Sequence, residues 1–558
     1  MIWIATALAT TDFTGTPVTT YTGEETFLQD GSVQLWGQIE LHEDGDRLLF
    51  VQEDFNDSLE WPADSDWAPW IHQMFGTGDP HSSNFLLHSA PLEPISEGTP
   101  ILLVPGAGDN GSRGFIVMAS RLDGSGRPVF VLTFAHPHGD VFMQAEIVAD
   151  AIERIRQRRG VSQVDVVGHS KGAIAAAVYA SNHSSASWPS SAYEQVGTEY
   201  ANDIRRFVAI GAPLDGIDTA YRWPAQNWLS LESDEAFSPS SWSTYYPYTT
   251  ANLYVTQDLS EQDHLSDGGD LFPGHRQLLR RQAHALPGES FLGPYSVQQD
   301  WYTTYEGGLG YVSWSEGIDA AIDDAGDLLA ALEENGVDPE VELFVLAGEN
   351  PLLHNGAEYQ WIAAFGESWV DVATAGLDAW AELLAEAAEE AGVVDIDPDE
   401  LRGLVQGKLV LGEISGPSDG LVFLSSATRV ETLTGRGASV GELRVVDLAH
   451  LDLLYASEIT GQILIDAGEA DPTEDGWMRA VGERYVEADT LGWVETVLAD
   501  PDTDEPDIDD TGFVEDDDPG DPDGSGRLAR NCDGCASGTG ALGAAWLGLL
   551  VLRRRRWS

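Results

Sequence analysis

The sequence predicts an α/β fold with a mostly parallel sheet and helices on both faces. From residue 98 to 215, short apolar runs alternate with segments of helical spacing, as expected for parallel strands joined by helices. Inside this region the apolar run 164–167 leads into Gly168-His169-Ser170-Lys171-Gly172, and the small-residue run 173–180 follows. A strand, a G-x-S-x-G turn and a helix in this order are typical of a nucleophile elbow. The two observations together place Ser170 at the carboxyl end of a parallel strand.

The elbow makes Ser170 the candidate nucleophile. Its turn forces the serine into a strained backbone conformation, which holds the hydroxyl clear of the chain. Gly168 and Gly172 are needed because a Cβ at either place would collide with a neighbouring strand or helix. A serine hydroxyl is a poor nucleophile at neutral pH, so it needs a base within reach and an acid that orients the base. In chains with this elbow the order is serine, acid, histidine.

His450 is the candidate base, because the segment 445–452 places it directly after a short strand-like run. His169 is next to the serine in sequence, but elbow geometry points its ring away from the hydroxyl. His136 and His138 lie on a loop after a strand. There an ordinary loop role is favoured over a place at the rim of the site.

Asp419 is the candidate orienting acid, because it lies in a tight turn flanked by glycine and proline, at residues 416–422. Glu349 competes with it, since Glu349 follows the apolar run 343–347, a position where some enzymes with this elbow carry their acid. We favour Asp419 because its Asp-Gly-Leu-Val turn suits the presentation of a side chain. The sequence therefore predicts Ser170 as nucleophile, His450 as general base and acid, and Asp419 as orienter.

Two backbone N–H groups are candidates for an oxyanion hole. The first belongs to Lys171, the residue after the nucleophile. The second is assigned to Ala107, in the glycine-rich loop 105–111 that follows the apolar run 100–104. An ordinary strand-to-helix turn is the alternative for this loop. A phosphate loop is disfavoured because the Walker spacing and its Gly-Lys-Ser/Thr are missing.

With these motifs the chain resembles a bacterial lipase or esterase of the α/β-hydrolase superfamily. The likeness extends over about residues 98 to 460 and is carried by Val104-Pro105-Gly106-Ala107-Gly108, Val167-Gly168-His169-Ser170-Lys171-Gly172, Ser418-Asp419-Gly420-Leu421-Val422, Ser425-Ser426-Ala427, His450-Leu451-Asp452 and, after the next strand, Ile210-Gly211-Ala212-Pro213-Leu214-Asp215-Gly216. The resemblance implies the same triad of Ser170, Asp419 and His450. It also implies cleavage of carboxylic esters, of lipids or small molecules, through an acyl-serine intermediate and without a required cofactor.

The chain departs from this family at two places, and the resemblance also raises the question of a structural calcium. Pro105-Gly106 stands where the family usually has His-Gly, and Lys171 stands where glutamine or methionine is usual. In some of these lipases the aspartate of His-Leu-Asp binds a structural calcium. Asp452 occupies that position here, although the sequence shows no partner acid for it. An amidase or acyltransferase on the same triad, or a surface binding protein without catalysis, are the alternative functions.

The composition is strongly acidic. The chain has 558 residues and a formal net charge of −65, with only two lysines, Lys171 and Lys408. Such a field repels nucleic acid and anionic membrane surfaces, so neither is an expected partner. Acidic residues are spread throughout, which favours a halophilic protein whose carboxylates are screened by salt, with a calcium-rich surface as the alternative.

The α/β region is expected at 98–498, with two segments before it and one insertion within it. Residues 1–9 are apolar and end in Ala-Leu-Ala, which resembles the remnant of a secretory signal, with a plain strand as the alternative. Residues 10–97 alternate polar and apolar residues and predict a β-rich segment. Residues 216–340 are rich in Trp, Tyr, Ser and Pro and predict a lid-like insertion, or a subdomain that packs on itself.

The carboxyl-terminal region predicts attachment to a surface. Residues 499–530 are rich in Asp, Pro and Gly and are expected to be an acidic disordered linker. Residues 531–558 contain Cys532 and Cys535, then a short apolar run and four arginines, and resemble the myxobacterial C-terminal sorting tag. The resemblance implies an exported enzyme held at the cell surface or outer membrane, with a sorting peptidase as partner. A permanent membrane anchor is the alternative for the apolar run.

Overall fold

The computed structural model describes slightly less than half of the chain. The described residues are 15–22, 36–43, 73–77, 80–112, 114–189, 197–217, 273–280, 326–349, 409–410, 413–414, 419, 422–470 and 475–500. The predicted leader at 1–9, the linker at 499–530 apart from its first two residues, and the tag at 531–558 lie outside them, as does most of the predicted insertion.

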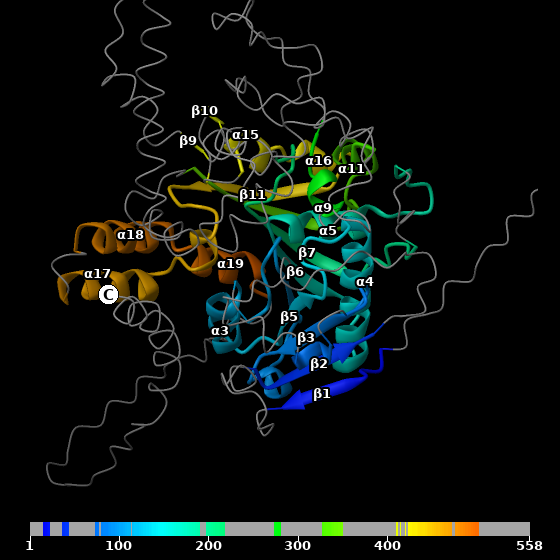
Figure 1. Cartoon of the computed structure of the whole chain (residues 1–558), viewed down its shortest axis with the longest axis horizontal. Helices are drawn as coiled ribbons and strands as arrows, with labels where there is room; N and C mark the ends of the chain where they lie inside the picture. Colours follow the sequence, from blue (N-terminus) through cyan, green and yellow to red (C-terminus); the bar gives the residue numbers. More distant parts are fainter. Residues whose placement is uncertain are drawn as a thin grey trace, which may run out of the picture.

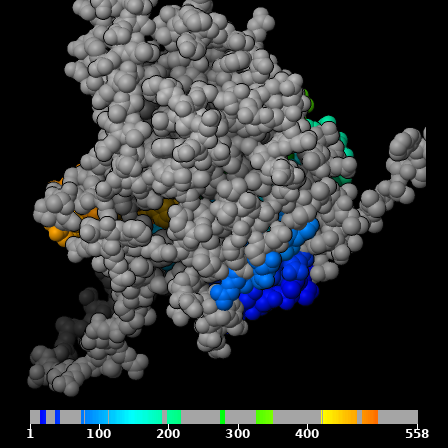
Figure 2. All heavy atoms as spheres, in the orientation of Figure 1, coloured from blue at the N-terminus to red at the C-terminus, as the bar shows by residue number. Residues whose placement is uncertain are grey.

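A mixed nine-stranded sheet forms the centre of the described structure, in the order β1-β2-β3-β5-β4-β6-β7-β8-β11 (Figure 1). Its strands are β1 (Thr19–Thr22), β2 (Gln38–His42), β3 (Phe85–Ser89), β4 (Ile101–Val104), β5 (Val129–Phe134), β6 (Val164–His169), β7 (Ile204–Ile210), β8 (Glu342–Gly348) and β11 (Ser439–Val446). The pairs from β1 to β5 are antiparallel, and every pair from β5 to β11 is parallel. The predicted β-rich segment therefore supplies leading strands to the main sheet, and β1 lies on the surface at its outer edge (Figure 2).

Helices cover both faces of this sheet, as the sequence predicts. One face carries α4 (Val141–Arg159), α5 (Lys171–Ser181) and α11 (Leu328–Asn335), and the other carries α3 (Ile116–Gly124) and α19 (Thr490–Leu498). The side chains of the strands divide between these two layers, because successive side chains of a strand point to opposite faces. In β4, for example, Leu102 and Val104 pack in the first core, and Ile101 and Leu103 in the second.

Shorter elements lie in the connections around the sheet. They are η2 (Glu93–Ile95), α9 (Pro273–Arg276), β9 (Leu409–Val410), β10 (Glu413–Ile414), α15 (Leu424–Ala427), α16 (Glu431–Thr434) and η5 (Asp452–Leu454). α17 (Glu458–Ala470) and α18 (Asp475–Ala488) form a hairpin that extends sideways from the sheet (Figure 1). Gly461 and Gly482 face each other where these two helices touch, and a Cβ on either would lie within 2.6 Å of the other's backbone.

No helix among the described residues is long and apolar enough to cross a membrane. The apolar run of the predicted tag lies outside those residues.

Parallel strands bring their carboxyl ends to one edge of a sheet, and ligands of open α/β sheets bind beyond this edge. Here β4 ends at Val104, β6 at His169, β7 at Ile210, β8 at Gly348 and β11 at Val446. Each of the predicted site residues follows one of these ends or a loop beside it.

Candidate active site

Ser170 occupies the turn between β6 and α5 in a strained conformation. Its φ is +52° and its ψ is −128°, in a region that side chains with a Cβ rarely adopt. The N–H of Ser170 donates to the carbonyl of Ile210, at 2.8 Å, so the turn is fixed against the end of β7. The side chain is partly exposed while its neighbours on both sides are buried. This is the geometry of a nucleophile elbow.

The two glycines of the motif leave no room for a side chain. A Cβ on Gly168 would lie 2.5 Å from the Cα of Ala173, and one on Gly172 would lie 2.3 Å from the carbonyl oxygen of Pro105. Both contacts are with backbone atoms, which cannot move aside cheaply. The close packing of β6 on α5 and of α5 on the loop after β4 therefore depends on these glycines.

His450 and Asp419 form a buried pair at the same edge. His450 Nδ1 lies 2.7 Å from Asp419 Oδ2, and the backbone N–H of His450 donates to the carbonyl of Asp419 at 2.8 Å. Asp419 Oδ1 accepts from the N–H of Val422 at 2.7 Å, so both carboxylate oxygens have partners. Because an ionised carboxylate only accepts, Nδ1 of His450 carries the proton and Nε2 is the basic nitrogen.

The elbow and the His450–Asp419 pair meet at Gly211. This residue follows Ile210 and has a φ of +55°. A Cβ on Gly211 would lie 3.1 Å from both Cε1 and Nδ1 of His450, so its absence makes room for the imidazole beside the strand that anchors Ser170. The structure thus brings Ser170, His450 and Asp419 to one place, although they lie 31 to 280 positions apart in the sequence.

The loop after β4 lies against Ser170. A Cβ on Gly106 would lie 2.9 Å from the Cβ of Ser170, so the backbone of this loop approaches the serine closely. Ala107 is the next residue and is partly exposed. Lys171, on the other side, is the first residue of α5, and the first N–H groups of a helix point out of its amino-terminal end. The two predicted oxyanion donors therefore flank Ser170.

The side chain of Lys171 is buried rather than directed to solvent. It is 1% exposed, and its ammonium donates to Gln144 Oε1. Gln144 in turn donates to the carbonyl of His136 at 3.0 Å. Gln144 belongs to α4, and nothing in the sequence marks it as part of the site. Only the packing of α4 against α5 brings it to the elbow.

Three histidines lie buried beside this lysine. His138 Nδ1 is 2.8 Å from His275 Nε2, which ties the loop after β5 to α9 of the insertion. Burial lowers the pKa of His275 to about 3, and the positive charge of Lys171 adds to the shift, so His275 is neutral at physiological pH. His136 and His138 are 1% and 0% exposed. The His138–His275 contact holds the loop and α9 together, and the buried side chains of His136 and His138 do not line an open rim.

Glu349, the competing acid, directly follows the end of β8. Its backbone N–H donates to the carbonyl of Val446 at 2.9 Å, and its side chain is exposed to solvent. The acid whose carboxylate contacts His450 is Asp419.

Asp452 is buried and is held by a protein donor, because its Oδ1 accepts from the hydroxyl of Tyr485 at 2.6 Å. Within the described ranges, no three or more His, Cys, Asp or Glu side chains are grouped so that they could hold a metal ion. The described surroundings of Asp452 therefore do not fit a calcium site.

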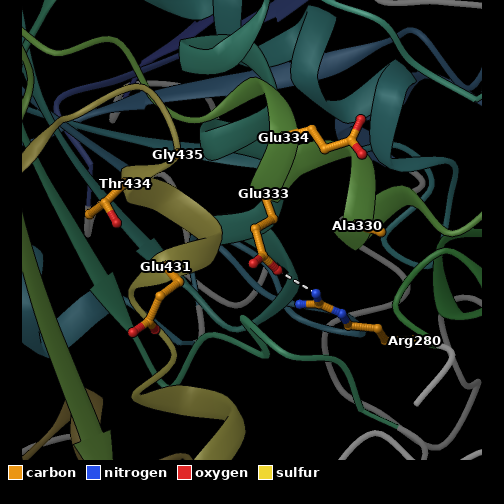
Figure 3. A pocket seen from close by; sticks show the side chains of 7 residues that line it. All are labelled: Arg280, Ala330, Glu333, Glu334, Glu431, Thr434 and Gly435. Carbon is orange, nitrogen blue, oxygen red and sulfur yellow. Dashed lines mark hydrogen bonds and ion pairs between the residues drawn. The ribbon is translucent and has the colours of Figure 1, made fainter. Parts of the chain in front are cut away.

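A separate open pocket of about 600 Å³ lies between α11 and α16 (Figure 3). It is lined by Arg280, Ala330, Glu333, Glu334, Glu431, Thr434 and Gly435. Arg280 and Glu333 form an ion pair across it, and Arg280 also pairs with the buried Asp215 at 2.7 Å. None of the three predicted triad residues lines this pocket, so it is distinct from the site at the elbow.

The sheet and the strained serine between β6 and α5 define the α/β-hydrolase fold, as the sequence predicts. No family model and no curated protein matches the chain. Solved structures similar to part of it include a gene product of Listeria innocua, at 15% identity and a TM-score of 0.26 over 64% of this chain and 89% of that one. Mature Bacillus licheniformis lipase BlEst2 is 12% identical, with a TM-score of 0.29 over 68% of this chain and 97% of that one. A thermostable carboxyl esterase from Bacillus coagulans, in complex with glycerol, is 13% identical, with a TM-score of 0.24 over 48% of this chain and 76% of that one. These similarities are too weak to indicate an activity, and the assignment rests on the chain's own sheet and elbow.

Proposed function

We propose that this protein is a serine hydrolase that cleaves carboxylic esters, as a lipase or esterase does. The observation that carries the proposal is the His450–Asp419 pair at the edge where the strained Ser170 stands. A strained serine, a histidine with its Nδ1 proton on a buried carboxylate, and two flanking backbone donors supply each part that acyl transfer needs.

The proposed reaction has two halves. His450 Nε2 takes the proton of the Ser170 hydroxyl as its oxygen attacks the ester carbonyl. The N–H groups of Lys171 and Ala107 stabilise the resulting oxyanion. When the intermediate collapses, the C–O bond to the alcohol breaks and His450 returns the proton to the leaving alcohol. Water then attacks the acyl-serine with the same base, which releases the carboxylic acid and restores Ser170.

The setting of the enzyme is part of the proposal. We infer that the tag at 531–558 exports the protein and holds it at the cell surface or outer membrane, with a sorting peptidase as partner. The net charge of −65 supports a salty working environment and argues against nucleic acid as a substrate. A lipid or small ester is the proposed substrate, and the proposed reaction requires no cofactor.

Hydrolysis of short- and long-chain nitrophenyl esters by the full chain in high salt tests this function. We expect turnover by the natural protein and a loss of about 10⁴-fold or more in kcat for Ser170→Ala, because the nucleophile is gone. Ser162→Ala is the matched control, since Ser162 is exposed in the turn before β6. Turnover that survives in Ser170→Ala would contradict the proposal. A folded natural protein inactive on esters but active on amides would redirect it to an amidase.

A further inference from the structure

His169 is buried between the two halves of the proposed catalytic site. It is the last residue of β6 and is only 2% exposed. Its ring lies 4.6 Å from the ring of His450, centroid to centroid, and 6.4 Å from that of Phe115 in an edge-on contact. The position before the serine therefore does not supply the base, but its side chain touches the residue that does.

The contact is a directed hydrogen bond. His169 Nε2 lies 3.2 Å from the backbone carbonyl oxygen of His450. Because a carbonyl oxygen only accepts, Nε2 of His169 must carry a proton. Burial lowers the pKa of His169 well below its usual value, and the adjacent His450 lowers it further. The ring is therefore neutral, so Nδ1 is the bare nitrogen, and no described residue offers Nδ1 a hydrogen bond. Because His169 is neutral, it does not repel the positive charge that His450 takes up during the proposed reaction.

The backbone of His450 is thus held from both sides. Its N–H donates to the carbonyl of Asp419 at 2.8 Å, and its C=O accepts from His169. The imidazole has one further anchor, its Nδ1 on Asp419 Oδ2. Without the bond from His169, the carbonyl of His450 loses the side-chain donor that fixes it. We expect the direction of His450 Nε2 toward Ser170 then to be less well defined.

We propose that His169 is a positioning residue that fixes the backbone of His450, and through it the alignment of His450 with Ser170. This inference rests on the proposed function for its catalytic consequence. The hydrogen bond itself can be tested whether or not the protein cleaves esters.

Three substitutions in the full chain separate positioning from packing. The amide nitrogen of His169→Gln reaches about as far as Nε2 of histidine and can restore the donor. The asparagine side chain in His169→Asn is too short to reach the carbonyl of His450, and the leucine in His169→Leu has no donor. We expect kcat on a short nitrophenyl ester to fall about 10- to 100-fold in the Asn and Leu variants with KM unchanged, because a small misplacement of a catalytic group has a cost of this order. The Gln variant is expected to recover most of kcat.

The second readout does not depend on activity. In protein labelled with ¹⁵N-histidine, the proton of His450 Nδ1 on Asp419 gives a low-field NMR signal, which is identified by its loss in Asp419→Asn. We expect this signal in the natural protein and in His169→Gln, and its broadening or loss in the Asn and Leu variants. An unchanged signal and unchanged kcat in His169→Leu would overturn the proposal, as would equal losses in all three variants. The natural protein could be inactive while the low-field signal is kept in His169→Gln and lost in the Asn and Leu variants. In that case the proposed function fails and the positioning role of His169 stands.

Discussion

The identity of the acid shows what single residues contribute to this site. Asp419 and Glu349 both lie near strand ends at the edge of the sheet, and the sequence offers each as a partner for the histidine. The structure gives Asp419 a full set of hydrogen bonds within the site, from His450 Nδ1 and from the N–H of Val422. Glu349 instead has an exposed side chain, which water solvates.

Asp419→Asn is expected to lower kcat by about 10⁴-fold, because an amide in this place favours the wrong tautomer of His450 and no longer stabilises its positive charge. Glu349→Gln should leave kcat nearly unchanged and serves as the matched control. Steady-state hydrolysis of a nitrophenyl ester by the two variants distinguishes the two acids. Near-full activity of Asp419→Asn together with loss in Glu349→Gln would make Glu349 the orienting acid.

Among the elements, the join between β2 and α4 shows how a charged cluster stabilises the fold. Glu40 of β2 is 1% exposed and accepts two hydrogen bonds from the guanidinium of Arg154, each at 2.7 Å, and one from His42 at 3.1 Å. Burial alone would raise the pKa of Glu40, but the bonds from Arg154 and His42 outweigh it and hold the pKa at about 2, against an ordinary value of 4.5. The antiparallel strands are thereby tied to the helix that crosses them.

Glu40→Gln is expected to lower the free energy of unfolding by about 3 kcal/mol at neutral pH, because it leaves the guanidinium of Arg154 without its carboxylate. The folded-state pKa of Glu40 is depressed, so the stabilisation is complete above pH 4.5 and is lost as the pH falls toward 2. The difference between variant and natural protein should therefore narrow in this window, as measured by denaturant unfolding at several pH values.

Glu153→Gln is the control for this comparison. It removes one of the two acidic partners of Arg156 on the same helix, and the Glu153 side chain is 40% exposed, so we expect a change below about 1 kcal/mol. A Glu40→Gln difference that is equally small, or that does not depend on pH, would show that the buried cluster adds nothing to stability.

At the scale of the whole molecule, the net charge of −65 is the dominant property. Many of the few arginines form ion pairs at junctions between the described elements, as Arg127 and Arg205 do with the buried Asp165. The remaining carboxylates far outnumber the positive charges, so their mutual repulsion opposes the compact state. Salt screens this repulsion, because the Debye length falls from about 10 Å at 0.1 M to about 3 Å at 1 M.

The thermal midpoint of the full chain should therefore rise as sodium chloride increases from about 0.1 to about 1 M. Differential scanning calorimetry with sodium chloride, and with sucrose at matched water activity, separates charge screening from general exclusion of solutes. A midpoint that stays flat or falls with salt, while sucrose raises it, would contradict an adaptation to a salty environment.

Much of the fold and of the site could be predicted because the signals are local. The strand, the G-x-S-x-G turn and the helix lie within 18 successive residues, and the glycine-rich loop directly follows its own strand. Chain order then indicated His450, and the turn chemistry of Asp419 favoured it over Glu349. The helical and apolar periods determine which face of each element is buried, so the two-faced α/β layering is also a consequence of the sequence.

What only the tertiary structure decided involves atoms that are far apart along the chain. The bond from His169 to the carbonyl of His450 spans 281 positions, and the contact of Lys171 with Gln144 depends on how α4 packs on α5. No sequence pattern predicts such pairs. Every residue has a backbone carbonyl, so this acceptor leaves no signal in the sequence, and a glutamine occurs in many different roles. The sequence by itself thus determined the elements and the candidate nucleophile, Ser170. The packing at the sheet edge decided which groups hold Ser170 and His450 in place, since their partners meet only when the strands align.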